Sequence, residues 1–208
     1  MRCLLFESII AVLLMGCASE YAHLQKIQES GECPDKILPL IIETSWYDAS
    51  VDVTGKHISG LLLIKNMPDN SKRVVFTSEA GLTFFDFSFS KEGNFHTVSV
   101  LKQFDRKAVI RTLQKDFALI FGLPFLNGTA ERYSAGDEVY FRFKEKNGTA
   151  YFITNKDCAS LQRLEWGDKG KRLVTVTTPG SGYPTPAMIE IDHHTFSMKI
   201  KLTRIVKE

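Results

Sequence analysis

The sequence is short of long apolar runs and of charge of one sign. Its N-terminal apolar run, Ile9–Met15, has seven residues, whereas a membrane-spanning helix needs about 20. The formal net charge of +2 indicates neither a nucleic-acid partner nor a strong field toward a membrane surface. What is present is an ordinary globular composition, with 44% apolar residues and 15 phenylalanines in 208 residues, which is enough to bury a substantial core.

Recognisable catalytic motifs are also absent. The sequence has no G-x-S-x-G elbow, no phosphate-binding loop and no H-E-x-x-H pair. Its five histidines lack an accompanying array of cysteines or carboxylates at metal-ligand spacing, and His193-His194 is predicted to lie at a hairpin tip. We therefore expect no enzyme activity, no metal and no cofactor. The 24 acidic residues leave carboxylate pairs open, so an envelope hydrolase is kept as a distant alternative.

The N-terminus has the pattern of a secretory signal. Arg2 precedes the apolar run Ile9–Met15, and the small residue Gly16 comes directly before Cys17. A cysteine at this place resembles the lipobox of bacterial lipoproteins. The resemblance implies that residues 1–16 are a signal peptide and that Cys17 carries acyl chains such as palmitate. By the sorting rule of such lipoproteins, Ala18 favours the outer membrane over the inner one, while the leaflet stays open.

Cysteines are scarce in the rest of the chain. Cys3 leaves with the signal and Cys17 is expected to be acylated, so only Cys33 and Cys158 remain. Outside the cytosol these two could pair, but their separation neither requires nor forbids a disulfide. Both alternatives stay open.

The chain after Cys17 divides into two parts. Residues 17–43 are predicted to be a lipidated N-terminus and tether, with a short helix through Tyr21, Leu24 and Ile27 as one alternative. Residues 44–208 alternate short apolar strands with turn signals and form one domain. About eleven strands are predicted, at residues 46–53, 58–66, 73–78, 82–90, 95–101, 139–146, 149–154, 161–166, 172–177, 187–192 and 195–205.

Two hairpins are specific enough to predict a register. Asn147-Gly148 between alternating runs is a strong hairpin signal, and a two-residue turn there pairs Phe143 with Phe152. A turn at His193-His194 pairs Ile191 with Phe196 and keeps one face apolar.

One long helix is predicted between Asp105, a good N-cap, and Gly122, a typical C-terminal residue. Its apolar stripe faces the core. The opposite side carries Lys107, Arg111 and Lys115, which form either an ordinary solvated face or a contact with anionic lipid head groups.

The predicted fold class is mainly β with one long helix (α+β), a curved antiparallel sheet or incomplete β-barrel with the helix on its concave side. Three strand patterns, Gly60–Lys65, Arg73–Phe76 before Gly81, and Pro186-x-x-Ile189 with Ile200-x-Leu202, resemble the LolA/LolB-like lipoprotein carriers. The resemblance implies a hollow half-barrel that accepts acyl chains, on a protein attached to the outer membrane by its lipid.

On this basis we expect a lipid or acyl-chain ligand. The candidate cavity-lining residues are five phenylalanines of the predicted strand and helix, Phe85, Phe87, Phe89, Phe117 and Phe121. An ordinary packed core is the alternative interpretation of this stripe. A lipoprotein of the same fold with a protein-binding or scaffolding role is the second functional hypothesis. The oligomeric state does not follow from the sequence.

Overall fold

The computed structural model describes residues 19–27, 40, 42–123, 125, 128–179 and 185–206. The predicted signal peptide, Cys17 and Cys33 lie outside the described residues. Cys158 is disulfide-bonded, and the other three cysteines of the sequence all lie outside the described part of the chain.

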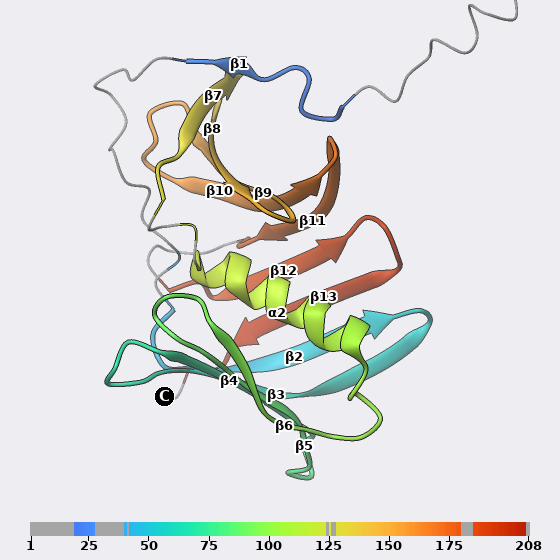
Figure 1. The fold of residues 1–208 in the computed structure, drawn as a ribbon. Coiled ribbons are helices and arrows are strands. Elements are labelled where there is room, and N and C mark those ends of the chain that lie inside the picture. The colour runs from blue at the N-terminus through green and yellow to red at the C-terminus, as the bar shows by residue number, and fades with distance from the viewer. Residues whose placement is uncertain are drawn as a thin grey trace, which may run out of the picture.

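Thirteen antiparallel strands form a single open, curved sheet (Figure 1). Five strands that precede the long helix form one half of it. They are β2 (Ser45–Val53), β3 (Lys56–Asn66), β4 (Lys72–Thr77), β5 (Thr83–Phe89) and β6 (Phe95–Val100). The two-residue strand β1 (Gln25–Lys26) comes first in the chain but pairs with β7 (Glu131–Ala135) of the other half. The predicted mainly β fold with one long helix is confirmed, and β3 is central as its nearly continuous apolar sequence indicates, because it lies between β2 and β4.

The strands after the helix form the other half. They are β7 (Glu131–Ala135), β8 (Glu138–Glu145), β9 (Gly148–Asn155), β10 (Leu161–Asp168), β11 (Lys171–Thr177), β12 (Met188–His193) and β13 (Met198–Arg204). The last strand returns to pair with β2, which joins the two halves into one sheet. The strand order is β1-β7-β8-β9-β10-β11-β12-β13-β2-β3-β4-β5-β6. The two strands beyond the eleven predicted are β1 and β7.

Both predicted hairpin registers are wrong by an even number of residues. In the β8–β9 hairpin Phe143 pairs with Ala150, and Phe152 pairs with Phe141. In the β12–β13 hairpin Ile191 pairs with Ile200, because the turn has four residues, 194–197, instead of two. The predicted faces are nevertheless correct, since a shift of two or four residues leaves every side chain on its own side of the sheet.

The helix α2 (Lys107–Phe121) lies across the sheet on its concave side (Figure 1). It ends as predicted, with Gly122 in the left-handed conformation at φ 69° and the Leu123 N–H donating to the Ala118 carbonyl at 2.9 Å. The predicted start is wrong. Arg106 is the N-cap, without a side-chain cap, and Asp105 belongs to the preceding turn, where its N–H donates to the Leu101 carbonyl at 3.1 Å.

The opposite face of the sheet carries a smaller apolar cluster around Tyr140, Tyr151 and Ile153. Residues 19–27, which the sequence assigned to a tether, lie on this face as a turn followed by β1. Tyr21 stacks on Tyr151 with ring centroids 4.1 Å apart, and its hydroxyl donates to Glu165 at 3.0 Å. Burial and the neighbouring Glu165 raise the pKa of Tyr21 above its ordinary value.

Candidate ligand cavity

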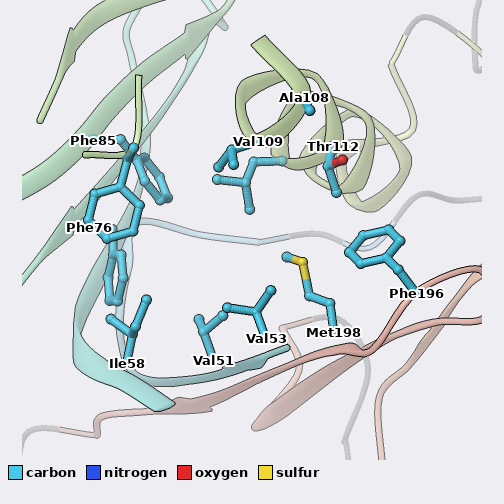
Figure 2. A pocket seen from close by; sticks show the side chains of 12 residues that line it. Val51, Val53, Ile58, Phe76, Phe85, Ala108, Val109, Thr112, Phe196 and Met198 are labelled. Atoms are coloured by element: carbon cyan, nitrogen blue, oxygen red, sulfur yellow. The ribbon is translucent and has the colours of Figure 1, made fainter. Parts of the chain in front are cut away.

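An apolar cavity of about 330 Å³ lies between α2 and the sheet (Figure 2). Strands β2, β3, β4, β5 and β13 supply one wall and the first turns of α2 the other. The lining residues are Val51, Val53, Ile58, Phe76, Phe85, Phe104, Ala108, Val109, Thr112, Leu113, Phe196 and Met198.

The floor of the cavity follows from the alternation of β2. Tyr47 and Ala49 point to the core and are fully buried, and Val51 and Val53 continue the same face toward the strand end. Val53 pairs with Met198, so small and flexible side chains lie together there. The helix presents Ala108 and Thr112 opposite them, one turn apart (Figure 2). Space remains because the side chains on both sides are short.

The lining is chemically uniform. Among the lining residues that the structure describes, Thr112 is the one with a polar group in its side chain. The cavity therefore offers dispersion and desolvation to a ligand, with no acid, base or nucleophile beyond a single hydroxyl. Its volume is at the lower end of the range for small-molecule sites. Phe196, 41% exposed, and the exposed Ala108 form its rim.

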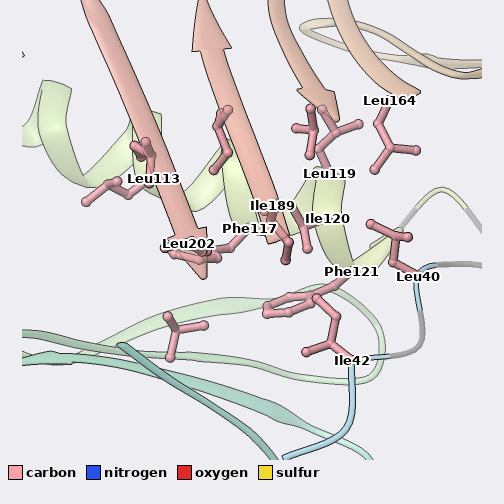
Figure 3. Close-up of a cluster of buried hydrophobic side chains, with 14 of the residues drawn as sticks. Leu40, Ile42, Leu113, Phe117, Leu119, Ile120, Phe121, Leu164, Ile189 and Leu202 are labelled. Carbon is pink, nitrogen blue, oxygen red and sulfur yellow. The ribbon is translucent and has the colours of Figure 1, made fainter. Parts of the chain in front are cut away.

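One of the five phenylalanines predicted to line a cavity does so. Phe85 contacts the cavity and stacks on Phe87, with ring centroids 4.4 Å apart. Phe87, Phe89, Phe117 and Phe121 are buried in the packed core behind it, and Figure 3 shows Phe117 and Phe121 among the buried helix residues. Phe89 packs edge-on against Phe121 at 5.5 Å. These four aromatic rings fill the core, whereas the shorter side chains of the cavity lining leave space between the helix and the sheet.

A buried polar pair ties the helix to the sheet near the cavity. Nε2 of His193 lies 3.1 Å from Oδ2 of Asp116, and the two side chains are 2% and 1% exposed. Burial raises the pKa of the Asp116 carboxyl above its ordinary value, and the hydrogen bond to His193 opposes that shift. The His193 ring also contacts Phe196 of the cavity rim, with centroids 4.8 Å apart.

The sequence placed His193 in a turn, and this prediction is wrong. His193 is the last residue of β12 and pairs with Met198. Its neighbour His194 is exposed and contacts Thr175 at 2.8 Å. The signal that could have located the buried pair is Asp116 itself, an acidic residue inside the apolar stripe of the helix.

The described residues contain no group of three or more His, Cys, Asp or Glu side chains arranged to hold a metal ion. Within the same part of the chain, no helix has the length and apolar character required to cross a membrane.

No protein-family model and no curated protein matches the sequence. Among solved structures, the chain is similar to a LolA superfamily protein from Nitrosomonas europaea, with a TM-score of 0.52 at 9% sequence identity, over 85% of this chain and 89% of that chain. The fold is therefore LolA-like, which confirms the resemblance predicted from the strand patterns at the level of the fold.

Two other solved structures show weaker similarity. One is a DUF1329 family protein from Desulfovibrio piger, with a TM-score of 0.43 and 9% identity over 79% of this chain and 84% of that chain. The other is an outer membrane lipoprotein-sorting protein domain from Vibrio parahaemolyticus, with a TM-score of 0.49 and 7% identity over 78% of this chain and 82% of that chain.

Proposed function

We propose that this protein is a non-enzymatic, membrane-anchored lipoprotein of the bacterial outer membrane that holds a lipid or acyl chain between α2 and the sheet. The observation that carries the proposal is the apolar cavity of about 330 Å³ with a single hydroxyl in its lining. Each methylene transferred into such a space contributes about 0.8 kcal/mol to the binding free energy, so several methylenes of an acyl chain would give several kcal/mol. The LolA-like fold supports the same class of ligand.

Filling the cavity is expected to remove the ligand. Val53→Trp would introduce an indole from the sheet and Thr112→Trp another from the helix, and both side chains line the cavity. We expect each variant to retain roughly tenfold less co-purified lipid than the wild type, because the volume available for dispersion contacts is lost. The measurement is mass spectrometry of organic extracts from purified protein.

Val98→Trp is the matched control, because Val98 is 46% exposed on β6 and does not line the cavity. It makes the same chemical change and should leave the lipid content unaltered. Circular dichroism of all three variants separates loss of ligand from loss of fold. Equal lipid content in Val53→Trp, Thr112→Trp and the wild type would contradict the proposal.

The anchor is proposed at Cys17, on the lipobox pattern of the sequence. A Cys17→Ser variant, expressed in a bacterium that processes lipoproteins, should incorporate no radiolabelled palmitate and should move from the membrane fraction to the aqueous fraction. The several acyl chains of a lipoprotein make attachment effectively permanent, so the expected change is nearly complete. Labelling of the serine variant at the wild-type level would overturn the anchor.

A second candidate function is protein binding without a cavity ligand. It is favoured by an exposed apolar surface formed by Trp46 of β2 and by Ile205 and Val206, which follow β13. These side chains are 40%, 44% and 72% exposed. The Ile205 N–H donates to the Trp46 carbonyl at 2.8 Å, which holds this surface together. Lipid-free wild-type protein in the extraction experiment would favour this candidate over the first.

A further inference from the structure

A second, polar groove of about 710 Å³ lies on the other side of α2 from the apolar cavity. The helix contributes three of its residues and the two hairpin turns β8–β9 and β10–β11 contribute the rest. They are Arg111, Gln114, Lys115, Lys146, Asn147, Asp168 and Lys169.

The groove is strongly basic. Arg111, Lys115, Lys146 and Lys169 are all exposed, and Asp168 is the one carboxylate among the described lining residues. In the described part of the chain none of the four cations forms an ion pair. The unmatched charge comes from three separate elements, so it is a property of how the chain folds and cannot be seen as a basic run in the sequence. Such a lining is complementary to phosphate groups.

The N-terminal segment is attached directly beside this groove. The Glu20 N–H donates to the Gly170 carbonyl at 2.8 Å, and the Ser19 hydroxyl contacts the same oxygen at 3.3 Å. Gly170 follows Lys169 of the groove in the β10–β11 turn. Cys17 comes two residues before Ser19, and two residues of chain span at most about 7 Å. An acyl anchor on Cys17 would therefore enter its membrane next to the basic groove.

The rim of the apolar cavity lies at the same edge of the molecule. Ala108 of the rim and Arg111 of the groove are one helical turn apart on α2. Figure 1 shows the β10–β11, β12–β13 and β2–β3 turns along one edge of the sheet, and the second of these turns carries the exposed Phe196. Attachment point, unpaired cations and cavity rim thus share one side of the protein.

We propose that this edge docks on an anionic phospholipid bilayer, with the cations of the groove against the lipid phosphates and the cavity rim facing the membrane. This proposal rests on the membrane anchor of the proposed function. Docking through the groove and lipid binding in the cavity are tested by separate measurements. Docking by this edge orients the cavity toward the surface from which an acyl chain would enter. An acyl anchor alone restrains distance from the membrane and leaves the orientation free.

The test uses the full chain with Cys17→Ser, so that no acyl anchor contributes. Co-sedimentation is measured with vesicles of phosphatidylglycerol and phosphatidylcholine, and with vesicles of phosphatidylcholine alone. The groove variant is Arg111→Gln/Lys146→Gln/Lys169→Gln. Lys115 is kept because its ammonium lies 5.6 Å from the Trp166 ring centroid. We expect at least a tenfold loss of binding to the anionic vesicles, since each cation near such a surface contributes roughly a fivefold factor.

The control Lys65→Gln/Lys156→Gln/Lys201→Gln removes the same charge from exposed positions on β3, in the β9–β10 turn and on β13, outside the groove and away from the three turns of the docking edge. It should bind anionic vesicles like the parent, and both triple variants carry the same signal segment, whose own affinity for vesicles therefore cancels. Equal binding by the two variants would overturn the proposal, as would binding that does not depend on phosphatidylglycerol.

Failure of docking and failure of ligand binding give different results. Lipid extraction and mass spectrometry on the same variants report on the cavity, which the groove substitutions do not touch. A groove variant that keeps its extracted lipid but loses vesicle binding supports both proposals. A wild type without extracted lipid that still docks through the groove overturns the cavity ligand and leaves the docking surface standing.

Discussion

Gly60→Ala is expected to destabilise the fold by on the order of 2–4 kcal/mol, although it adds a single methyl group. A Cβ at Gly60 would lie 2.1 Å from the Thr77 carbonyl oxygen and 3.1 Å from Cε2 of Phe76. The first atom belongs to the backbone of β4, which is held between β3 and β5 and cannot move aside. The gain of about 0.4–1 kcal/mol from restricting the unfolded chain is too small to offset this overlap.

Gly128→Ala is the control, because a Cβ there would meet a single atom of the described residues, the Phe125 carbonyl oxygen at 3.3 Å. Urea unfolding should show a lower midpoint for Gly60→Ala and little change for Gly128→Ala. The same methyl would press on Phe76, which lines the cavity, so the lipid content of surviving Gly60→Ala protein should also fall. Equal midpoints in the two alanine variants would mean that β3 and β4 do not approach so closely.

The sequence predicted the faces of the strands better than their pairing. Hydrophobic alternation fixes which side chains are buried, and it does so equally well for registers that differ by two residues. Phe143 was therefore assigned to the correct side, but its predicted partner was Phe152, whereas its partner in the sheet is Ala150. The length of the turn decides between such registers. In β12–β13 the turn includes the polar His194 and the aromatic Phe196, which is a composition without a strong turn preference.

The position of the cavity could not be predicted from the phenylalanines, the most conspicuous apolar residues of the sequence. Phenylalanines dominate the sequence of β5, the helix stripe carries Phe117 and Phe121, and such large aromatic side chains fill the core. A cavity arises where opposing side chains are too short to meet, as Val53 and Ala108 are across the gap. That information lies in which residues face each other across the sheet and helix. It becomes available only when the tertiary arrangement is known.

The strand β1 was missed for a related reason. β1 has two residues, Gln25 and Lys26, and no local pattern marks it as a strand. It forms because Tyr21 docks on Tyr151 and Glu165, far away in sequence, and brings the following residues alongside β7. A strand that depends on such distant contacts cannot be predicted from its own residues.

The second large effect is expected at the buried Asp116–His193 pair. His193→Leu would leave the Asp116 carboxylate without its partner in a site where Oδ1 already has no hydrogen bond within the described residues. Removing one member of a buried pair typically costs 3–5 kcal/mol, because the remaining charge is uncompensated. The double variant Asp116→Leu/His193→Leu removes both polar groups and should recover most of that loss, since an apolar pair of similar volume is often neutral.

The loss in His193→Leu should also depend on pH. Burial raises the pKa of Asp116 above its ordinary value of 3.8, and without His193 the pKa rises further. A carboxyl whose pKa is raised by folding binds more protons in the folded state. Its contribution to stability is therefore fully present below pH 3.8 and is lost as the pH rises through the raised value. The stability deficit of His193→Leu should be larger at pH 8 than at pH 4.

Unfolding free energies at these two pH values, taken relative to the double variant, cancel the titration of all other groups. A deficit that is the same at both pH values would show that the Asp116 carboxyl is not the group left unpaired. Asp116 comes from α2 and His193 from β12, so the pair clamps the helix over the cavity. His193→Leu should accordingly release co-purified lipid at pH 8 while the double variant retains it, because an apolar contact restores the clamp.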